Sequence, residues 1–107
     1  MSRRKRDAHT DDDFLADLVL WQNNPEHAAK VAKLAHQGNK NAQYALGLMY
    51  AEGRGLKQDE SESYYWLSHA IVQGDQDAKL LRDIVQQSMT LEQIKLADIR
   101  IAKTLTV

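Results

Sequence analysis

A short pattern that occurs twice along the chain constrains its fold more than any other feature. Gln37-Gly38 and Gln73-Gly74 stand 36 positions apart, and each pair ends a segment of helix-forming residues. Three polar residues and then an alanine, Ala42 or Ala78, follow each pair. Repeats of roughly 20 to 50 residues are typical of solenoids built from stacked helix pairs. The spacing therefore predicts helix pairs that recur along the chain.

The composition of the 107-residue chain favours helices and a single domain. Helix-forming residues such as alanine, leucine, glutamine and lysine are abundant, whereas the chain has five glycines and one proline. With 43% hydrophobic residues, a chain of this length buries roughly two thirds of its unfolded surface. It has no cysteine, so neither disulfides nor thiolate metal sites support the fold. We predict one all-α domain.

Start and stop signals divide residues 11–107 into six expected helices. Asp11 to Asp13 precede the first helix, Asn24-Pro25 opens the second, and Thr90 with Gln93 forms a capping box before the last. The expected ranges are 14–24, 26–38, 41–53, 61–74, 76–87 and 90–105, with residues 12–36 as an N-terminal pair. Residues 1–10 are charged and lack an apolar period, so we expect a disordered basic tail there.

The glycines of LGLMYAEGRGLKQD, residues 46–59, raise the alternative of a phosphate-binding loop. A P-loop requires GxxxxGK[ST], and a dinucleotide-binding fold requires GxGxxG after a strand. Here a helical pattern precedes Gly53, and no third glycine follows Gly55. We therefore interpret the stretch as a hinge, in which glycine adopts conformations that are costly for other residues. Gly47 is expected inside the preceding helix, where the missing side chain lets a neighbouring helix approach closely.

The hinge and its two flanking helices together carry a family pattern. The positions that carry it are Ala42, Tyr44, Leu46, Gly47, Met49, Tyr50, Gly53, Gly55, Leu56, Asp59, Trp66, Ala70, Gly74 and Ala78. This pattern resembles the Sel1-like repeat, an α/α relative of the tetratricopeptide repeat. Residues 39–74 match one full repeat, with a partial repeat on either side and a closing helix at 90–105. Ser63 and Leu67 depart from the pattern, because the family usually has alanine at the first position and often an aromatic residue at the second.

The resemblance implies a short right-handed α/α superhelix of about six helices that acts as a protein–protein adaptor or scaffold without catalytic activity. Its groove would bind a segment of another protein, and such small arrays are typical of bacteria. The outward positions of the repeat and its loop, Gln43, Glu52 and Arg54, are the expected contact residues. Tyr65 is a further candidate, because Tyr64 is expected to face the neighbouring helix and the next residue should turn outward.

No set of residues predicts catalysis, a cofactor or a metal site. The four histidines have no HExxH spacing and no cysteine partner. The carboxylates gather at the expected helix starts, where capping and the helix dipole explain them. Ser68 and His69 are adjacent, and neighbours on a helix point about 100° apart, so they form no nucleophile pair.

The basic tail suggests an alternative function, a small regulator that touches nucleic acid. Arg3, Arg4, Lys5 and Arg6 would contact the phosphates in a salt-sensitive manner. The whole chain has 15 acidic and 14 basic residues, so the part outside the tail is acidic and no other nucleic-acid surface is expected. The chain shows neither a signal peptide nor a long apolar segment. We therefore expect a cytoplasmic protein that does not associate with membranes.

The last expected helix suggests weak self-association. It is apolar on two sides and therefore needs two neighbours, of which one should be the fifth helix and the other the N-terminal helix or a second copy of the chain. Its main stripe consists of Leu91, Ile94, Ala97, Ile101 and Leu105.

Overall fold

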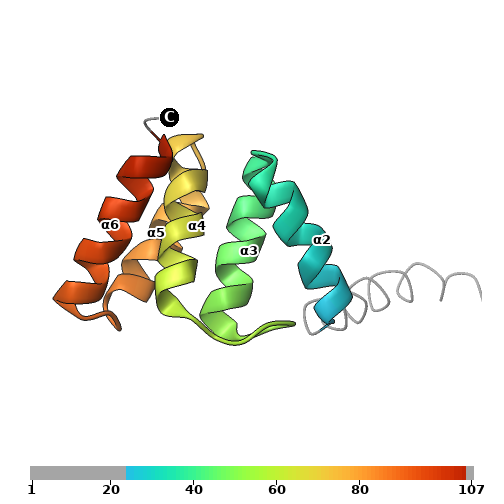
Figure 1. Ribbon diagram of the computed structural model, residues 1–107, viewed down its shortest axis with the longest axis horizontal. Helices are drawn as coiled ribbons and strands as arrows, with labels where there is room; N and C mark the ends of the chain where they lie inside the picture. The colour runs from blue at the N-terminus through green and yellow to red at the C-terminus, as the bar shows by residue number, and fades with distance from the viewer. Residues whose placement is uncertain (1–23, 106–107) are drawn as a thin grey trace, which may run out of the picture.

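The computed structural model describes residues 24–105, which form five helices. The helices are α2 (Pro25–His36), α3 (Lys40–Glu52), α4 (Glu60–Val72), α5 (Gln76–Gln86) and α6 (Leu91–Leu105) (Figure 1). This part of the chain contains helices and no strand, which confirms the predicted all-α class. Residues 1–23, with the basic tail and nearly all of the expected first helix, lie outside the described residues.

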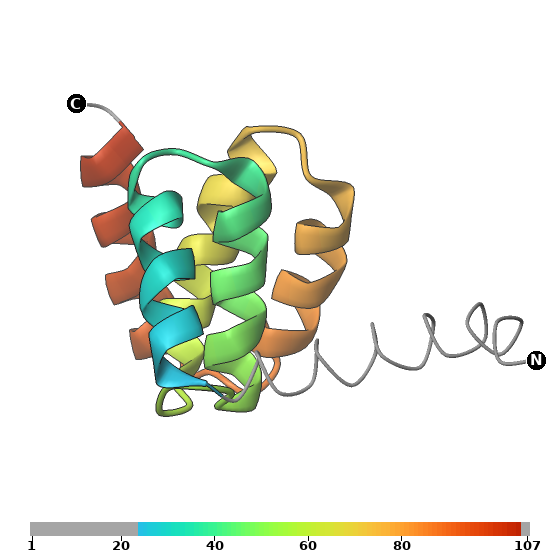
Figure 2. The same cartoon turned by 90° about the vertical axis from the view of Figure 1, so that its right-hand side faces the viewer.

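The helices lie in two layers, with α2, α4 and α6 in one layer and α3 and α5 in the other (Figure 2). The central helix is α4, which packs against α3, α5 and α6, while α2 packs against α3. Every position of α4 from Ser63 to Ala70 is buried. Helix α6 packs mainly along α4 and not along α5, the neighbour expected from the sequence.

The helix starts follow from local capping. In four helices, the side-chain oxygen of the residue before the helix accepts a hydrogen bond from a backbone N–H group of the first turn. These capping residues are Asn24, Asn39, Asp59 and Asp75. At the start of α6, the amide of Gln93 donates to the Thr90 hydroxyl over 3.0 Å, and the Thr90 amide donates to the Gln93 side chain over 2.9 Å. The predicted capping box is thus confirmed. These hydrogen bonds satisfy N–H groups that have no partner within the helix.

The two turns of the sequence repeat have the same geometry. Gly38 and Gly74 have φ angles of 94° and 95°, in a region that side chains disfavour. In both turns, the amide of the residue after the glycine donates to the carbonyl oxygen five positions earlier, over 3.1 Å. In addition, α2 and α4 end at equivalent positions, and α3 and α5 begin at equivalent positions. The period of 36 residues is therefore a period of the local structure as well as of the sequence.

Gly47 is a point of close approach between α3 and α4. A Cβ atom there would lie 2.6 Å from Cγ and Cδ2 of Leu67 and 3.3 Å from the carbonyl oxygen of Ser63. The Ser63 hydroxyl donates to the carbonyl oxygen of Gly47 over 2.7 Å. Ser63 and Leu67, the two departures from the Sel1-like pattern, thus complete this contact, and both are fully buried. The prediction that Gly47 permits close packing is confirmed.

The other positions of the family pattern occupy the core and the α3–α4 loop. Trp66 and Met49 are buried, and Tyr50 and Leu56 pack against the same apolar cluster. Gly53 ends α3 with a φ of 69°, as expected for a left-handed cap. The alanines and leucine of the pattern are buried in the two core clusters: Ala42, Leu46, Ala70 and Ala78.

The apolar stripe expected on the last helix is only partly buried. Ala97 is buried in α6, and Ile94 and Ile101 pack against the core. Leu91, the first residue of the helix, is 85% exposed, and Leu105, its last residue, is exposed as well. The middle of the stripe therefore holds α6 to the core. Self-association through this helix stays a prediction.

Candidate interaction surface

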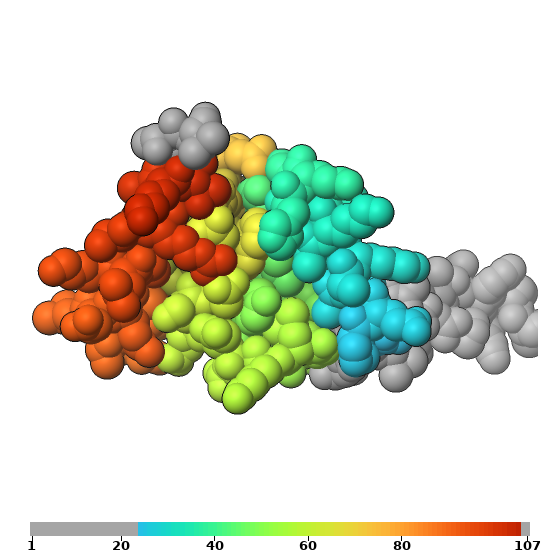
Figure 3. Space-filling model, in the orientation of Figure 1, coloured from blue at the N-terminus to red at the C-terminus, as the bar shows by residue number. Residues whose placement is uncertain are grey.

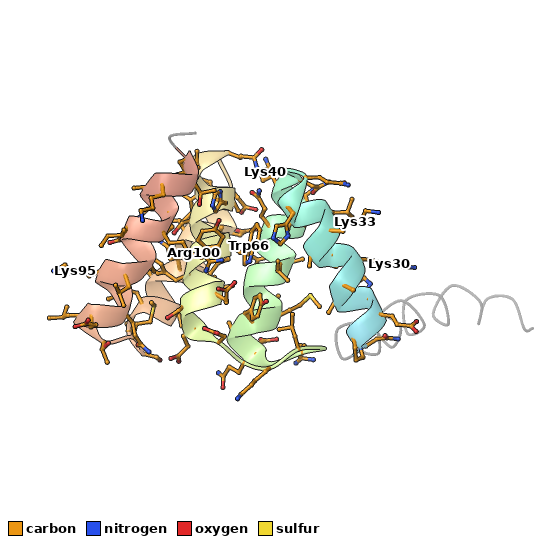
Figure 4. The ribbon with its side chains drawn as sticks, in the orientation of Figure 1. Lys30, Lys33, Lys40, Trp66, Lys95 and Arg100 are labelled. Carbon is orange, nitrogen blue, oxygen red and sulfur yellow. The ribbon has the colours of Figure 1, made fainter. Side chains whose placement is uncertain are left out.

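One face of the molecule brings together residues that are far apart in the sequence. On this face, which we call the α2–α6 face, atoms of α4 lie between those of α2 and α6 (Figure 3). Figure 4 shows Trp66 of α4 in the space between the two flanking helices and Arg100 reaching from α6 toward α4. Lys30 and Lys33 point away from this space on the outer side of α2, and Lys95 does so on α6.

Four rings form an aromatic cluster on the α2–α6 face. The rings of His36 in α2 and Trp66 meet edge to face, with the ring centroids 4.7 Å apart. Tyr65 contacts Trp66 at 5.1 Å and His69 at 4.6 Å, again with the edge of one ring against the face of the other. Such contacts contribute roughly 0.5–1.5 kcal/mol each beyond the burial of area. They hold α2 and α4 in a defined relation.

Tyr65 is not an outward contact residue, so this prediction is wrong. Its side chain is 7% exposed, and its hydroxyl shares a hydrogen bond of 3.1 Å with the Thr104 hydroxyl of α6. The guanidinium of Arg100 lies over its ring, 3.6 Å from the centroid. The prediction assumed that α4 has one packed side, which would turn Tyr64 and Tyr65 in different directions. Because α4 has neighbours on several sides, both tyrosines are buried.

Arg100 lies at the edge of a hollow between α4 and α6. It forms an ion pair with Glu62 of α4, yet its side chain stays 48% exposed. The hollow has a volume of about 260 Å³ and is lined by Ser61, Gln93, Leu96, Ala97 and Arg100. Leu96, one of its walls, is 59% exposed. The site thus has an apolar depression beside the guanidinium of Arg100. The Tyr65 ring and Glu62 hold this guanidinium in position.

On the same face, the side chain of His69 has a buried nitrogen atom without a hydrogen-bond partner among residues 24–105. This atom is Nε2, which is inaccessible to solvent. Burial lowers the pKa of His69 below its ordinary value of 6.5, and the positive charge of Arg100 lowers it further. The ring is therefore neutral at pH 7. A buried polar atom without a partner costs roughly 1–3 kcal/mol, so this position is not optimised for stability alone.

Gln43 is a structural residue, which corrects its assignment as a partner contact. It is 4% exposed, and its amide nitrogen donates to the carbonyl oxygen of Ala35 over 3.2 Å. Its side-chain oxygen accepts from Gln73 over 2.8 Å, and the same Gln73 nitrogen lies 3.0 Å from the carbonyl oxygen of Gly38. These hydrogen bonds tie the first turn of the repeat to the second. The prediction failed because it treated a position between two turns as part of a free helix surface.

Glu52 and Arg54 lie near the α3–α4 loop, at the opposite end of the molecule from the two glycine turns (Figure 1). Nε of Arg54 is 2.5 Å from Oε1 of Glu52, and both side chains are accessible. Exposed ion pairs of this kind contribute little to stability. Their accessibility is compatible with a contact role, which stays a prediction.

No constellation for catalysis or metal binding stands out in the described part of the chain. Within residues 24–105, no group of three or more histidine, aspartate or glutamate side chains is placed to hold a metal ion. The Ser68 hydroxyl donates to the carbonyl oxygen of Tyr64 over 2.8 Å and accepts from Arg82 over 3.1 Å, so its hydrogen bonds do not involve His69. In the same residues, no helix has both the length and the apolar character that a membrane-spanning segment needs. The proposed nucleic-acid contacts, Arg3, Arg4, Lys5 and Arg6, lie outside the described residues.

The residues that build the α2–α6 face could not be identified from the sequence. His36, Arg100 and Thr104 were not singled out, because their partners on α4 lie 30 to 39 positions away in the chain. Helical periodicity indicates which side of a helix is apolar, but it does not indicate which residue of another helix lies opposite.

Comparisons with known proteins reveal no relative of this chain. No protein-family model matches it, and no curated protein or solved structure does so either. The resemblance to the Sel1-like repeat therefore stays a prediction. The geometry of the α2–α6 face is the evidence that bears on function.

Proposed function

We propose that this protein is a non-catalytic interaction module whose α2–α6 face binds a segment of another protein. The observation that carries the proposal is the hollow beside Arg100, which combines an exposed apolar wall with a positioned charge. Binding sites typically have apolar walls with a few fixed polar groups that set the orientation of the ligand. Such a module needs no chemistry of its own and acts by bringing proteins together.

We propose in addition that the helices belong to a short Sel1-like α/α array. The support is the equivalence of the turns at Gly38 and Gly74 and the close helix contact at Gly47. Arrays of this type present one face of successive helix pairs to their ligands. The α2–α6 face is the corresponding surface in this proposal, and the Glu52–Arg54 pair is a competing contact site.

A peptide selection followed by NMR mapping tests the binding proposal. Peptides that bind the full chain are selected from a random display library and are then titrated into the isotope-labelled protein. We expect the largest chemical-shift changes at His36, Leu96 and Arg100, whose side chains border the α2–α6 face. Changes centred on Glu52 and Arg54 would move the site to the loop. Failure to select any binding peptide would contradict the proposed function.

A further inference from the structure

We propose that the segment bound on the α2–α6 face is acidic, with an apolar side chain in the hollow and a carboxylate on Arg100. This inference rests on the proposed function and specifies its ligand. It concerns the five residues that line the hollow, together with Glu62 and Tyr65.

The guanidinium of Arg100 has capacity for a second carboxylate. Arginine carries five N–H donors. Among residues 24–105, the guanidinium has one hydrogen-bonded partner, Glu62, which accepts from Nη1. Since the side chain is 48% exposed, the remaining donors can reach a ligand. Arginine also matches the fork geometry of a carboxylate, which gives directed binding.

The position of Arg100 is fixed before a ligand arrives. Its guanidinium lies 3.6 Å from the centroid of the Tyr65 ring, and Glu62 holds one of its nitrogens. The Tyr65 hydroxyl is in turn held by Thr104, one helical turn beyond Arg100 on α6. A side chain that is already ordered loses less conformational entropy on binding. This order favours recognition of one carboxylate over diffuse attraction of anions.

The hollow supplies the apolar part of the recognition. Leu96 and Ala97 form its α6 wall, and Ser61 borders it from α4. Leu96 is 59% exposed, so covering it with a partner side chain would remove apolar surface from water. A nucleic acid offers phosphates but no aliphatic side chain for this depression. The combination therefore favours a peptide over a nucleic acid.

The charges along α6 set the direction of the ligand. Glu92 lies in the first turn of the helix and Lys95 points away from the α2–α6 face (Figure 4), whereas Arg100 lies in the second half of the helix. Asp98 is turned to a different partner, because it accepts a hydrogen bond of 2.8 Å from the Tyr64 hydroxyl. The carboxylate of the ligand should thus lie toward the C-terminal half of α6, beyond the apolar residue that occupies the hollow.

The test uses synthetic peptides on the full chain. Octapeptides in a serine and glycine background carry one leucine or phenylalanine and one glutamate, at every spacing from one to four residues and in both orders. Each has a matched peptide with glutamine in place of glutamate. We expect the best glutamate peptide to bind at least about fivefold more tightly than its glutamine match, and this ratio to shrink as salt is raised.

Four variants, one of them a control, assign the effect to the site. Arg100→Gln should abolish the preference for glutamate, and Ser61→Phe, which fills the hollow, should abolish the preference for the apolar residue. Arg54→Gln is the matched control, because this arginine is also accessible and paired with a glutamate but lies at the α3–α4 loop. Arg100→Lys should give an intermediate preference for glutamate, because lysine keeps the positive charge but lacks the forked donors of a guanidinium. Thermal unfolding of each variant shows whether it is folded.

Several results would overturn the inference. Peptides from the random selection that map to the α2–α6 face without enrichment in acidic residues would leave the proposed function standing and refute the acidic ligand. Loss of binding in Arg54→Gln instead of Arg100→Gln would place the site at the α3–α4 loop, and it would refute both the acidic ligand on Arg100 and the binding role of the α2–α6 face. If the glutamate peptides fail to bind and a single-stranded oligonucleotide binds through Arg100, the ligand is a nucleic acid.

Discussion

Helices α2 and α4 occupy equivalent places in the two helix pairs, yet their surroundings differ. Each is followed by a glutamine and a glycine with nearly the same backbone angles. Leu34 of α2 is 46% exposed, whereas Ala70, its equivalent in α4, is fully buried. Lys30 is exposed where α4 has the buried Trp66. The geometry of each turn therefore depends on residues nearby in the sequence, whereas the exposure of a side chain depends on which helices pack around it.

The largest effect is expected where equivalent positions differ most in burial. Trp66→Ala should lower the free energy of unfolding by about 3–5 kcal/mol, because it removes a buried ring that contacts His36 and Tyr65. Lys30→Ala, at the equivalent position of α2, should change it by less than about 0.5 kcal/mol. Urea unfolding followed by circular dichroism measures both. Similar losses in the two variants would contradict the contrast between α2 and α4.

The contact at Gly47 extends the comparison to α3 and α5. Gly47→Ala should destabilise the protein by about 1–3 kcal/mol, because the new methyl group collides with Leu67. The equivalent position in α5 is Asp83, whose pairing with Lys79 at 4.0 Å is exposed. Asp83→Ala should cost less than about 0.5 kcal/mol. The melting temperatures of the two variants give the test, and an unchanged value for Gly47→Ala would show that the helices have room to separate.

The glycine turns should respond alike, because their geometry is the same. Gly38→Ala and Gly74→Ala should each cost about 1–2 kcal/mol, since a side chain is disfavoured at positive φ. A Cβ atom at either position would meet no other atom within 4 Å, so the backbone alone sets the cost. Urea unfolding of both variants should give values within about 0.5 kcal/mol of each other. A clear difference would mean that the turns are equivalent in shape but not in energy.

The smallest expected effect is a pH dependence that comes from one residue of α4, His69. Because the folded pKa of His69 is lowered, the unfolded chain binds its proton more readily. This histidine therefore reduces stability as the pH falls below about 6.5, and it adds no pH dependence to the stability at higher pH. The free energy of unfolding should fall less between pH 7.5 and pH 5.5 in His69→Gln than in the wild type. The equivalent α2 substitution, Lys33→Gln, should leave the wild-type pH dependence intact, and an equal slope in all three proteins would contradict the assignment.

Features that depend on nearby residues were predictable from the sequence. The capping box at Thr90 and Gln93, the glycine cap at Gly53 and the repeated turn each arise from side chains within a few positions of the backbone that they shape. Gly47 was predictable as well, because a glycine inside a helical pattern often marks a close contact. These features fix the helices and the all-α class.

The α2–α6 face was not predictable in the same way. Helical periodicity predicts Gln43 and Tyr65 as outward residues only if each helix has one buried side. The structure surrounds α4 with neighbours, and the hydrogen bond between Tyr65 and Thr104 spans 39 positions. Likewise, the pair of Glu62 and Arg100 joins residues 38 positions apart. Contacts of this range depend on how helices pack, which the spacing of residues along one helix does not define.

The most direct test of the proposed function is a crystal structure of the full chain with a peptide taken from the random selection. The account predicts that the peptide lies on the α2–α6 face, with an apolar side chain between Ser61 and Leu96 and a carboxylate on Arg100. A peptide bound at Glu52 and Arg54, or on the far side of α5, would contradict it.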